Sequence, residues 1–260
     1  MKNFISSFKK SGIVLFTAIS LLNYNNVKAQ STDTVKTTGW FSHQLAGAAQ
    51  VQVTYRKANL GQLNQILNNN GIPSLGHNDV WINASMSHIH GKWLFEDGIG
   101  FTPVTTSDAD NLKAKFNQYQ LYTRAAYNFS NNPNLRLYPF VGLNFSAAVL
   151  DIQDNNRIQS TSDFSQELLN STSSKTFYQP NFGIELGAGM DYLIKVKSKN
   201  MGCFEVERNI PIGIRAGYYI NAAQGDWKID SYKLQNSPDQ KQSAVFVSLN
   251  IGLGYEIKKQ

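Results

Sequence analysis

A single cysteine, Cys203, is present among the 260 residues of this chain, so no internal disulfide can form. Long apolar runs are also missing. Beyond residue 29 no stretch approaches about 18 apolar residues, which excludes helical membrane spans. The sequence contains no phosphate-binding loop, no dinucleotide fingerprint, and no G-x-S-x-G or H-E-x-x-H motif. Disulfide-stapled domains and the common nucleotide-dependent enzymes are therefore excluded, and no cofactor is expected.

The excess of basic residues is small once the N-terminal segment is set aside. The whole chain has 24 Lys+Arg and 18 Asp+Glu, a formal net charge of +6. Four of the lysines (Lys2, Lys9, Lys10 and Lys28) lie in the first 29 residues, which contain no acidic residue. The remainder has 20 basic and 18 acidic residues, a net charge of +2. Because nucleic-acid binding needs a concentrated basic face, we expect no nucleic-acid partner.

Residues 1–29 have the pattern of a secretory signal peptide. Basic residues come first, an apolar stretch covers residues 12–22, and Val27-Lys28-Ala29 offers the small side chains that signal peptidase reads. We expect cleavage after Ala29, which leaves Gln30 as the first mature residue. An uncleaved anchor helix is the alternative, although the apolar stretch is too short to span a bilayer. The chain is therefore expected to be exported.

Residues 135–149 alternate bulky apolar side chains with small or polar ones. One parity carries Leu135, Leu137, Pro139, Val141, Leu143, Phe145, Ala147 and Val149, and the other carries Arg136, Tyr138, Phe140, Gly142, Asn144, Ser146 and Ala148. Successive side chains of a β-strand point to opposite faces, so a period of two predicts a strand between two different environments. Five such segments lie between Lys115 and Ile257. At about ten residues or more, each can cross a membrane at a tilt, which predicts a transmembrane β-barrel.

The whole chain is interpreted as a signal peptide (1–29), a periplasmic lead-in (30–42) and an outer-membrane barrel domain (43–260). Eight strands are expected at residues 44–55, 79–88, 92–103, 115–129, 135–149, 178–194, 210–222 and 243–257. The connection at 56–78 contains Leu60, Leu63, Ile66 and Leu67 at a spacing that predicts one or two helical turns. Long connections alternate with shorter ones, as in outer-membrane barrels, whose short turns are periplasmic and long loops extracellular. The sequence therefore predicts an all-β, eight-stranded antiparallel up-and-down barrel with both termini in the periplasm.

Alternation alone does not decide which parity faces inward. In a secreted lipocalin-like barrel the apolar parity would surround a ligand, whereas in a membrane barrel it faces lipid. Two features favour lipid. The apolar parity carries no charge across the middle of the last five strands, where a charge would cost about 2–4 kcal/mol. The polar parity is rich in glycine, which suits a narrow, filled lumen; these residues are Gly183, Gly187, Gly189, Gly213, Gly217, Gly252 and Gly254.

Three stretches resemble small outer-membrane β-barrel proteins of the Bacteroidota. They are the Val-Lys-Ala site before Gln30, residues 138–145 (YPFVGLNF) and residues 249–255 (LNIGLGY). The resemblance covers most of the mature chain, but its motifs are generic to barrels. It implies insertion by the outer-membrane insertion machinery, which reads a C-terminal aromatic residue in many barrels. Here the chain continues past Tyr255 to Lys258-Lys259-Gln260, so that signal is displaced or absent.

Charged residues of the last five strands fall mostly on the expected lumen parity. They are Arg124, Arg136, Glu185, Asp191, Arg215 and Glu256, three positive and three negative. Because a narrow lumen excludes bulk water, we expect these charges to pair with one another as a structural ion-pair network. The alternative is a gate whose rearrangement admits small solutes.

Other chemistry-bearing residues give weaker signals. His43, His88 and His90 map near one rim of the expected barrel, and His88 and His90 share a strand face at a spacing that can hold a metal. No acid or cysteine is fixed nearby, so no metal site is predicted. A lipid hydrolase would need a serine beside a histidine, but Ser87 and His88 are neighbours in a strand and point to opposite faces.

We therefore expect a non-enzymatic outer-membrane barrel whose surface loops serve adhesion, recognition or envelope integrity. The natural interaction surfaces are the loops at 56–78, 153–175 and 223–242, and their extracellular ligand is unknown. Outer-membrane lipid is the partner of the apolar face. A narrow, porin-like channel for small or apolar solutes is the first alternative, although eight strands leave little open lumen. An outer-membrane lipid-modifying enzyme is the second.

Overall fold

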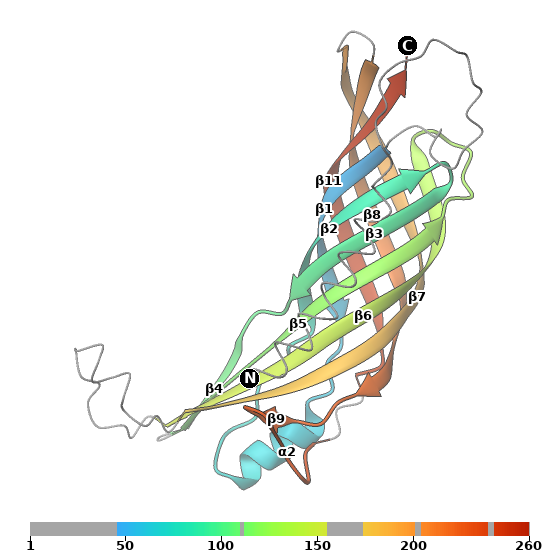
Figure 1. The fold of residues 1–260 in the computed structure, drawn as a ribbon. Helices are drawn as coiled ribbons and strands as arrows, with labels where there is room; N and C mark the ends of the chain where they lie inside the picture. Colours follow the sequence, from blue (N-terminus) through green and yellow to red (C-terminus); the bar gives the residue numbers. More distant parts are fainter. Residues whose placement is uncertain (1–45, 110–111, 155–173, 201–203, 239–241, 260) are drawn as a thin grey trace, which may run out of the picture. The chain divides into compact units, whose positions relative to one another are not determined.

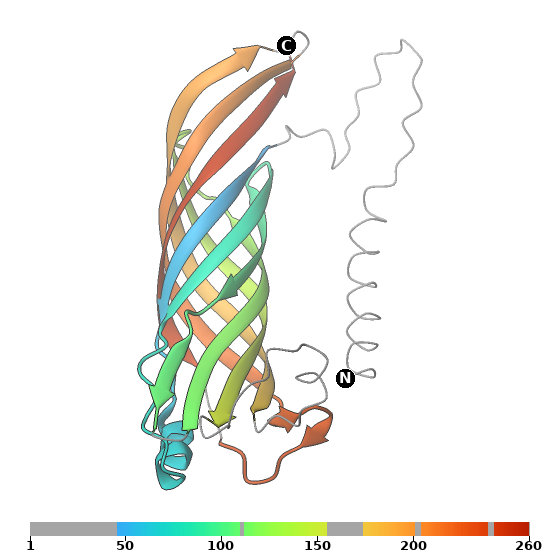
Figure 2. The same cartoon turned by 90° about the vertical axis from the view of Figure 1, so that its left-hand side faces the viewer.

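The computed structural model describes residues 46–109, 112–154, 174–200, 204–238 and 242–259. Within these residues eight long strands follow one another around an antiparallel β-barrel (Figures 1 and 2). The strands are β1 (Ala46–Arg56), β2 (Val80–His90), β3 (Trp93–Phe101), β5 (Leu112–Tyr127), β6 (Leu135–Asp154), β7 (Lys175–Asn200), β8 (Phe204–Gln224) and β11 (Ala244–Lys259).

The barrel is closed by β1, which pairs with β2 on one side and with the last strand, β11, on the other. Val51, for example, lies opposite Ala84 of β2 and Ile251 of β11. The remaining strands pair antiparallel in chain order, from β2 with β3 around to β8 with β11. The expected eight-stranded antiparallel up-and-down barrel is therefore confirmed. Closure leaves no open strand edge around the wall.

The two ends of the barrel carry connections of different length. At one end, here called the short-turn end, β2 and β3 are joined by Gly91 and Lys92, and residues 128–134 join β5 to β6. Gly91 has a φ of 61°, in the left-handed region that glycine adopts readily. The first residue of β1 and the last residues of β11 lie at this end too (Figure 1). The longer connections 57–79 and 225–243 belong to the opposite end, here called the loop end.

The two faces of the wall have opposite chemistry, as the alternation predicts. On β1, Gln52 is fully buried while Val53 is 51% exposed; on β6, Asn144 is fully buried while Leu143 is 43% exposed. Apolar side chains therefore point outward and polar ones inward. A lipocalin-like barrel would show the reverse, so that alternative is wrong. Asp97 of β3 interrupts the apolar surface, because it is exposed on the outward face between Phe95 and Ile99.

Glycines on the inward face make room for large lumen side chains. A Cβ added to Gly183 would overlap the Tyr219 ring, and one added to Gly189 would lie 2.5 Å from the Tyr138 ring. Gly98 stands in the same relation to the Tyr122 ring. Real carbon atoms do not approach so closely, so each aromatic ring occupies the space that its glycine leaves. The glycine-rich parity is thus a packing feature of the lumen.

Helix α2 (Gly61–Asn69) lies in the β1–β2 connection, where the sequence predicts one or two helical turns. The side chain of Asn64 fastens it to the returning chain: its Nδ2 donates to the Leu75 carbonyl at 3.1 Å, and the Leu75 amide donates to its Oδ1 at 2.9 Å. Gly71, with a φ of 76°, turns the chain away from the helix. No helix in the described part of the chain is both long and apolar enough to cross a membrane.

Several strand ends differ from those expected. We expected strands to end at 194 and resume at 210, with a connection of medium length that contains Cys203. Instead β7 continues to Asn200 and β8 begins at Phe204, and the two pair over most of that extension. The residues at these strand ends are mostly polar, so the sequence shows little alternation of apolar and polar side chains there. Backbone hydrogen bonds between strands form without such alternation. Short strands were also missed: β4 (Thr105–Asp108) pairs with β5, β9 (Lys228–Ile229) pairs with β7, and β10 spans Tyr232–Lys233.

Some of the expected features lie outside the described residues. They are the signal peptide with its cleavage site after Ala29, the lead-in 30–42, His43, Cys203 and most of the loop 153–175.

Candidate functional site

Glu96 of β3 is the centre of a buried ion-pair cluster in the middle of the lumen. Its carboxylate lies 2.7 Å from Nη1 of Arg215 and 3.3 Å from Nη1 of Arg124. Nε2 of Gln52 donates to it at 2.5 Å. Nε of Arg124 also donates to Oε2 of Glu185 at 2.7 Å. The four charged side chains therefore form a chain, Glu185–Arg124–Glu96–Arg215, that crosses the lumen from β7 to β8 by way of β5 and β3.

A second carboxylate lies toward the short-turn end. Asp191 of β7 is 1% exposed and accepts hydrogen bonds from the Tyr138 hydroxyl at 2.9 Å and from Nδ2 of Asn250 at 3.0 Å. Nε of Arg215 donates to the same Tyr138 oxygen at 3.1 Å. Tyr138 thus connects Asp191 to the Glu96 cluster. The cavity beside these groups has a volume of about 10 Å³, which is enough for a single water.

The structure brings together four of the six lumen charges named from the sequence: Arg124, Glu185, Arg215 and Asp191. Arg136 lines the same small cavity as Asp191 and Arg215 but makes no ion pair within the described residues. Glu256 lies closer to the short-turn end, is partly exposed, and makes none either in that part of the chain. Glu96 was not among the predicted lumen charges, because that prediction covered only the last five strands. Glu96 lies between Phe95 and Asp97, which point outward, so the period of two places its side chain in the lumen.

Arg56, at the loop end of β1, is a further buried cation that the sequence reading missed. Its guanidinium carbon lies 4.2 Å from the Trp81 ring centre and 4.3 Å from the Tyr219 ring centre. Aromatic faces attract a cation, more strongly where water is excluded. No carboxylate forms an ion pair with Arg56 in the part of the chain that the structure describes. The two rings therefore replace a counter-ion in stabilising this charge.

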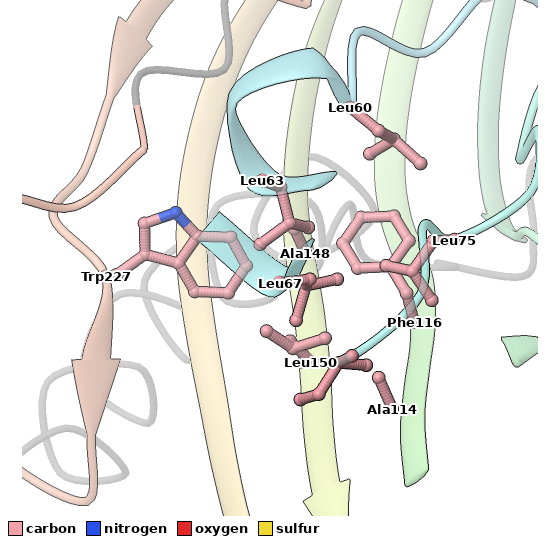
Figure 3. Close-up of a cluster of buried hydrophobic side chains, with 10 residues drawn as sticks. Leu60, Leu63, Leu67, Leu75, Ala114, Phe116, Ala148, Leu150 and Trp227 are labelled. Carbon is pink, nitrogen blue, oxygen red and sulfur yellow. The ribbon is translucent and has the colours of Figure 1, made fainter. Parts of the chain in front are cut away.

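Beyond Arg56 the inward face changes from polar to apolar. On β6 the inward residues run from Asn144 and Ser146 to Ala148 and Leu150, and β5 changes in the same way. Figure 3 shows Phe116 of β5 and Leu150 of β6 beside the leucines of α2. The cluster, here called the loop-end cap, consists of Leu60, Leu63, Leu67, Ile72, Leu75, Ala114, Phe116, Ala148, Leu150 and Trp227.

A cavity of about 440 Å³ opens beside the loop-end cap, between α2, the loop ends of β5 to β7, Trp227 and residues 234–238. Its volume falls within the range of roughly 300–1,000 Å³ that small-molecule sites occupy. Most of its walls are apolar, and the polar groups gather on a few positions. Its lining comprises Leu63, Ile66, Leu67, Asn70, Ile72, Leu112, Leu150, Ile152, Lys175, Phe177, Trp227, Leu234, Gln235, Asn236, Ser237 and Pro238.

Two contacts lie near Trp227 and Leu234 of the cavity wall. Lys233 lies 2.8 Å from Asp226, and its hydrogen bond and charge lower the pKa of that carboxyl from its ordinary value. The Leu234 amide donates to the Trp227 carbonyl at 2.9 Å. This hydrogen bond therefore keeps Trp227 and Leu234, two residues of the cavity wall, next to each other.

The remaining candidates are not brought together. His88 is exposed on the outer face, while Ser85 and Ser87 are buried on the inner face, so no serine–histidine pair forms on β2. His90 lies at the short-turn end with its ring centre 6.3 Å from that of Phe95. Among the described residues, no three His, Cys, Asp or Glu side chains are close enough to hold a metal ion.

No protein-family model and no curated protein matches this sequence. Its fold is similar to those of solved outer-membrane or surface proteins. Neisserial surface protein A is 14% identical, with 80% of this chain and 97% of that chain covered and a TM-score of 0.38. Ail, the attachment invasion locus protein of Yersinia pestis, is 13% identical (81% and 97% covered, TM-score 0.36). A major outer membrane protein from Thermus thermophilus is 11% identical (81% and 98% covered, TM-score 0.39).

Proposed function

We propose that this chain is a non-enzymatic outer-membrane protein whose closed barrel presents a binding surface at its loop end. In this proposal the apolar outer face contacts lipid, the short-turn end lies in the periplasm and the loop end faces outside. The observation that carries it is the contrast between two cavities: about 10 Å³ in the middle of the lumen and about 440 Å³ at the loop end. Among the described residues, the cavity beside Glu96 and Asp191 has room for about one water, whereas the cavity at the loop end has room for a ligand.

The outward face supports a membrane location. Exposed apolar residues cover every strand of the barrel, an amount that is unusual for a protein surface in water. Aromatic residues stand at both limits of this surface; on β5 they are Tyr119 and Tyr127. Along the strand that spacing is about 26 Å, or roughly 20 Å along the axis at a tilt of about 40°, which is near the height of the lipid-facing band of known barrels.

The lengths of the connections support the proposed orientation. Known outer-membrane barrels have short periplasmic turns and longer extracellular loops, and the short turns lie at the end where this barrel begins and finishes. The loop end then lies outside, as do helix α2 and the 440 Å³ cavity. The ion-pair cluster around Glu96 supports a sealed lumen, because breaking it exposes unpaired charges in a space that excludes bulk water.

A conductance experiment separates this proposal from the channel alternative. The purified protein is inserted into planar bilayers, alongside a Glu96→Ala variant whose cluster is broken. We expect no steady conductance from the native protein, because the Glu96–Arg124–Arg215 cluster fills the lumen. A steady, ohmic conductance of the native protein would favour the channel instead. Lipid mass spectrometry of a deletion strain tests the enzyme alternative, and an altered acyl or headgroup pattern restored by the intact gene would overturn the non-enzymatic proposal.

A loop-end variant tests the binding surface itself. Ile66 is exposed on α2 and lines the cavity, whereas its neighbour Gln65 is exposed but does not. We expect Ile66→Glu to reproduce the adhesion or envelope defect of the deletion strain while the barrel remains inserted, and Gln65→Glu to behave as the native protein. Equal phenotypes of the two variants would contradict a functional role for the cavity.

A further inference from the structure

We propose that the 440 Å³ cavity binds a free single-chain amphiphile with a carboxylate head, such as a fatty acid. This inference rests on the proposed binding role of the loop end and names the class of ligand. Three observations carry it: the chemistry of the walls, the position of the cavity along the strands, and a lysine on the lining that makes no ion pair among the described residues.

The walls suit an aliphatic chain. Three wall residues belong to the inward face of the barrel strands: Leu150 and Ile152 of β6 and Phe177 of β7. They lie at the loop ends of these strands, beyond the polar part of the lumen. Leu63 and Leu67 of α2 face them across the cavity. Burying one methylene group between such walls stabilises a complex by about 0.8 kcal/mol, so a chain of several methylenes gives useful affinity without any hydrogen bond.

The position of the cavity favours a free amphiphile over a lipid of the bilayer. On β6 the strongly exposed apolar surface reaches Phe145, and the wall of the cavity begins at Leu150, about 16 Å further along the strand. Between them the outward side chains Ala147 and Val149 are only partly exposed. The cavity therefore stands outside the lipid-facing band and takes its ligand from the aqueous side.

A lysine on the lining favours a carboxylate head. Trp227, which is only 3% exposed, adds its ring to the apolar walls. Lys175, at the first position of β7, is exposed, lines the cavity and makes no ion pair within the described chain. Its ammonium group is the cation that a carboxylate would meet.

Quenching of Trp227 by a brominated fatty acid tests the proposal. The probe is 11-bromoundecanoic acid, because bromine quenches an indole only at close range, and the protein is the full mature chain held in amphipol. The contribution of Trp227 is the difference between the spectra of the native protein and Trp227→Phe. We expect saturable quenching of this contribution. The methyl ester of the probe should bind more weakly.

Matched variants locate the two ends of the ligand. Lys175→Gln should weaken binding of the acid roughly 1.4- to 5-fold, as expected for loss of an exposed ion pair, and should remove the difference between acid and ester. Lys113→Gln is the control, since Lys113 is paired with Asp108 and does not line the cavity. Ile66→Glu should weaken binding at least fivefold, and Gln65→Glu should not.

Each other outcome overturns the proposal in a recognisable way. Equal binding of the acid and its methyl ester would show that the cavity does not recognise a carboxylate. Quenching by dibrominated phospholipid in vesicles makes a bilayer lipid the occupant. Quenching only after deletion of residues 155–173 makes that segment of the chain the occupant. If no probe quenches Trp227 and the native barrel shows no conductance in planar bilayers, the amphiphile proposal is rejected. The proposed function stands in that case, because it is tested separately by the conductance measurement.

Discussion

Replacing Glu96 by alanine is expected to destabilise the barrel, because it leaves a buried arginine without a carboxylate partner. The carboxylate is shared by Arg124 and Arg215, and Arg215 has no other carboxylate within ion-pair distance among the described residues. Removing one member of a buried pair typically costs about 3–5 kcal/mol, because the other charge is left buried without compensation. Arg124 retains Glu185, so most of the loss should fall on Arg215.

Equilibrium unfolding in urea provides the measurement. The protein is refolded into lipid vesicles, and its unfolding is followed by tryptophan emission and by heat-modifiable gel mobility. Glu96→Ala should lower the free energy of unfolding by about 3–5 kcal/mol, and Glu96→Gln, which keeps hydrogen-bonding atoms but no charge, should lower it less. Asp97→Asn, which removes an acid from the outward face of the same strand, should not lower it. An unfolding free energy of Glu96→Ala equal to that of the native protein would refute the idea that charge pairing holds the lumen together.

Three further changes test other parts of the fold. Asp97→Leu removes an acid from the outward face and should raise the free energy of unfolding in vesicles by about 1–2 kcal/mol, an effect absent if that face does not meet lipid. Gly183→Val places a side chain where the Tyr219 ring lies, so the folded, heat-modifiable gel band should be lost and partly restored by Tyr219→Ala. Leu67→Ala leaves a hole in the loop-end cap worth about 2–5 kcal/mol, so proteolysis at residues 57–79 should accelerate while the gel band persists.

The wall of the barrel is the part that could be predicted from sequence. Alternation places Leu143 outward and Asn144 inward wherever a strand separates lipid-like from polar surroundings, and the structure agrees. The ends of the strands were less predictable. In the β7–β8 hairpin the polar residue Lys195 lies opposite Asn209, and Asn200 lies opposite Glu205. This pairing involves the backbone, so no pattern of side chains predicts it.

The candidate site was the least predictable part. The helix in the β1–β2 connection was expected, but its packing partners Phe116 and Leu150 lie far away in sequence on strands of another pair. Because both residues have the inward parity, the sequence predicts that they line the lumen. The alternation does not show where the lumen ends and the loop-end cap begins. Trp227 comes from a connection read only as a polar loop, and no local signal brings it to α2. These contacts depend on the closed barrel, not on any one segment.

Surface labelling of single cysteines in intact cells tests the central claim, that the barrel crosses the outer membrane with its loop end outside. With Cys203 replaced by serine, Ser237→Cys places a thiol at the rim of the loop-end cavity, and Asn132→Cys places one in the short turn between β5 and β6. A membrane-impermeant maleimide should label Ser237→Cys in intact cells and Asn132→Cys only after lysis. Labelling of both variants, or of Asn132→Cys alone, in intact cells would contradict the account.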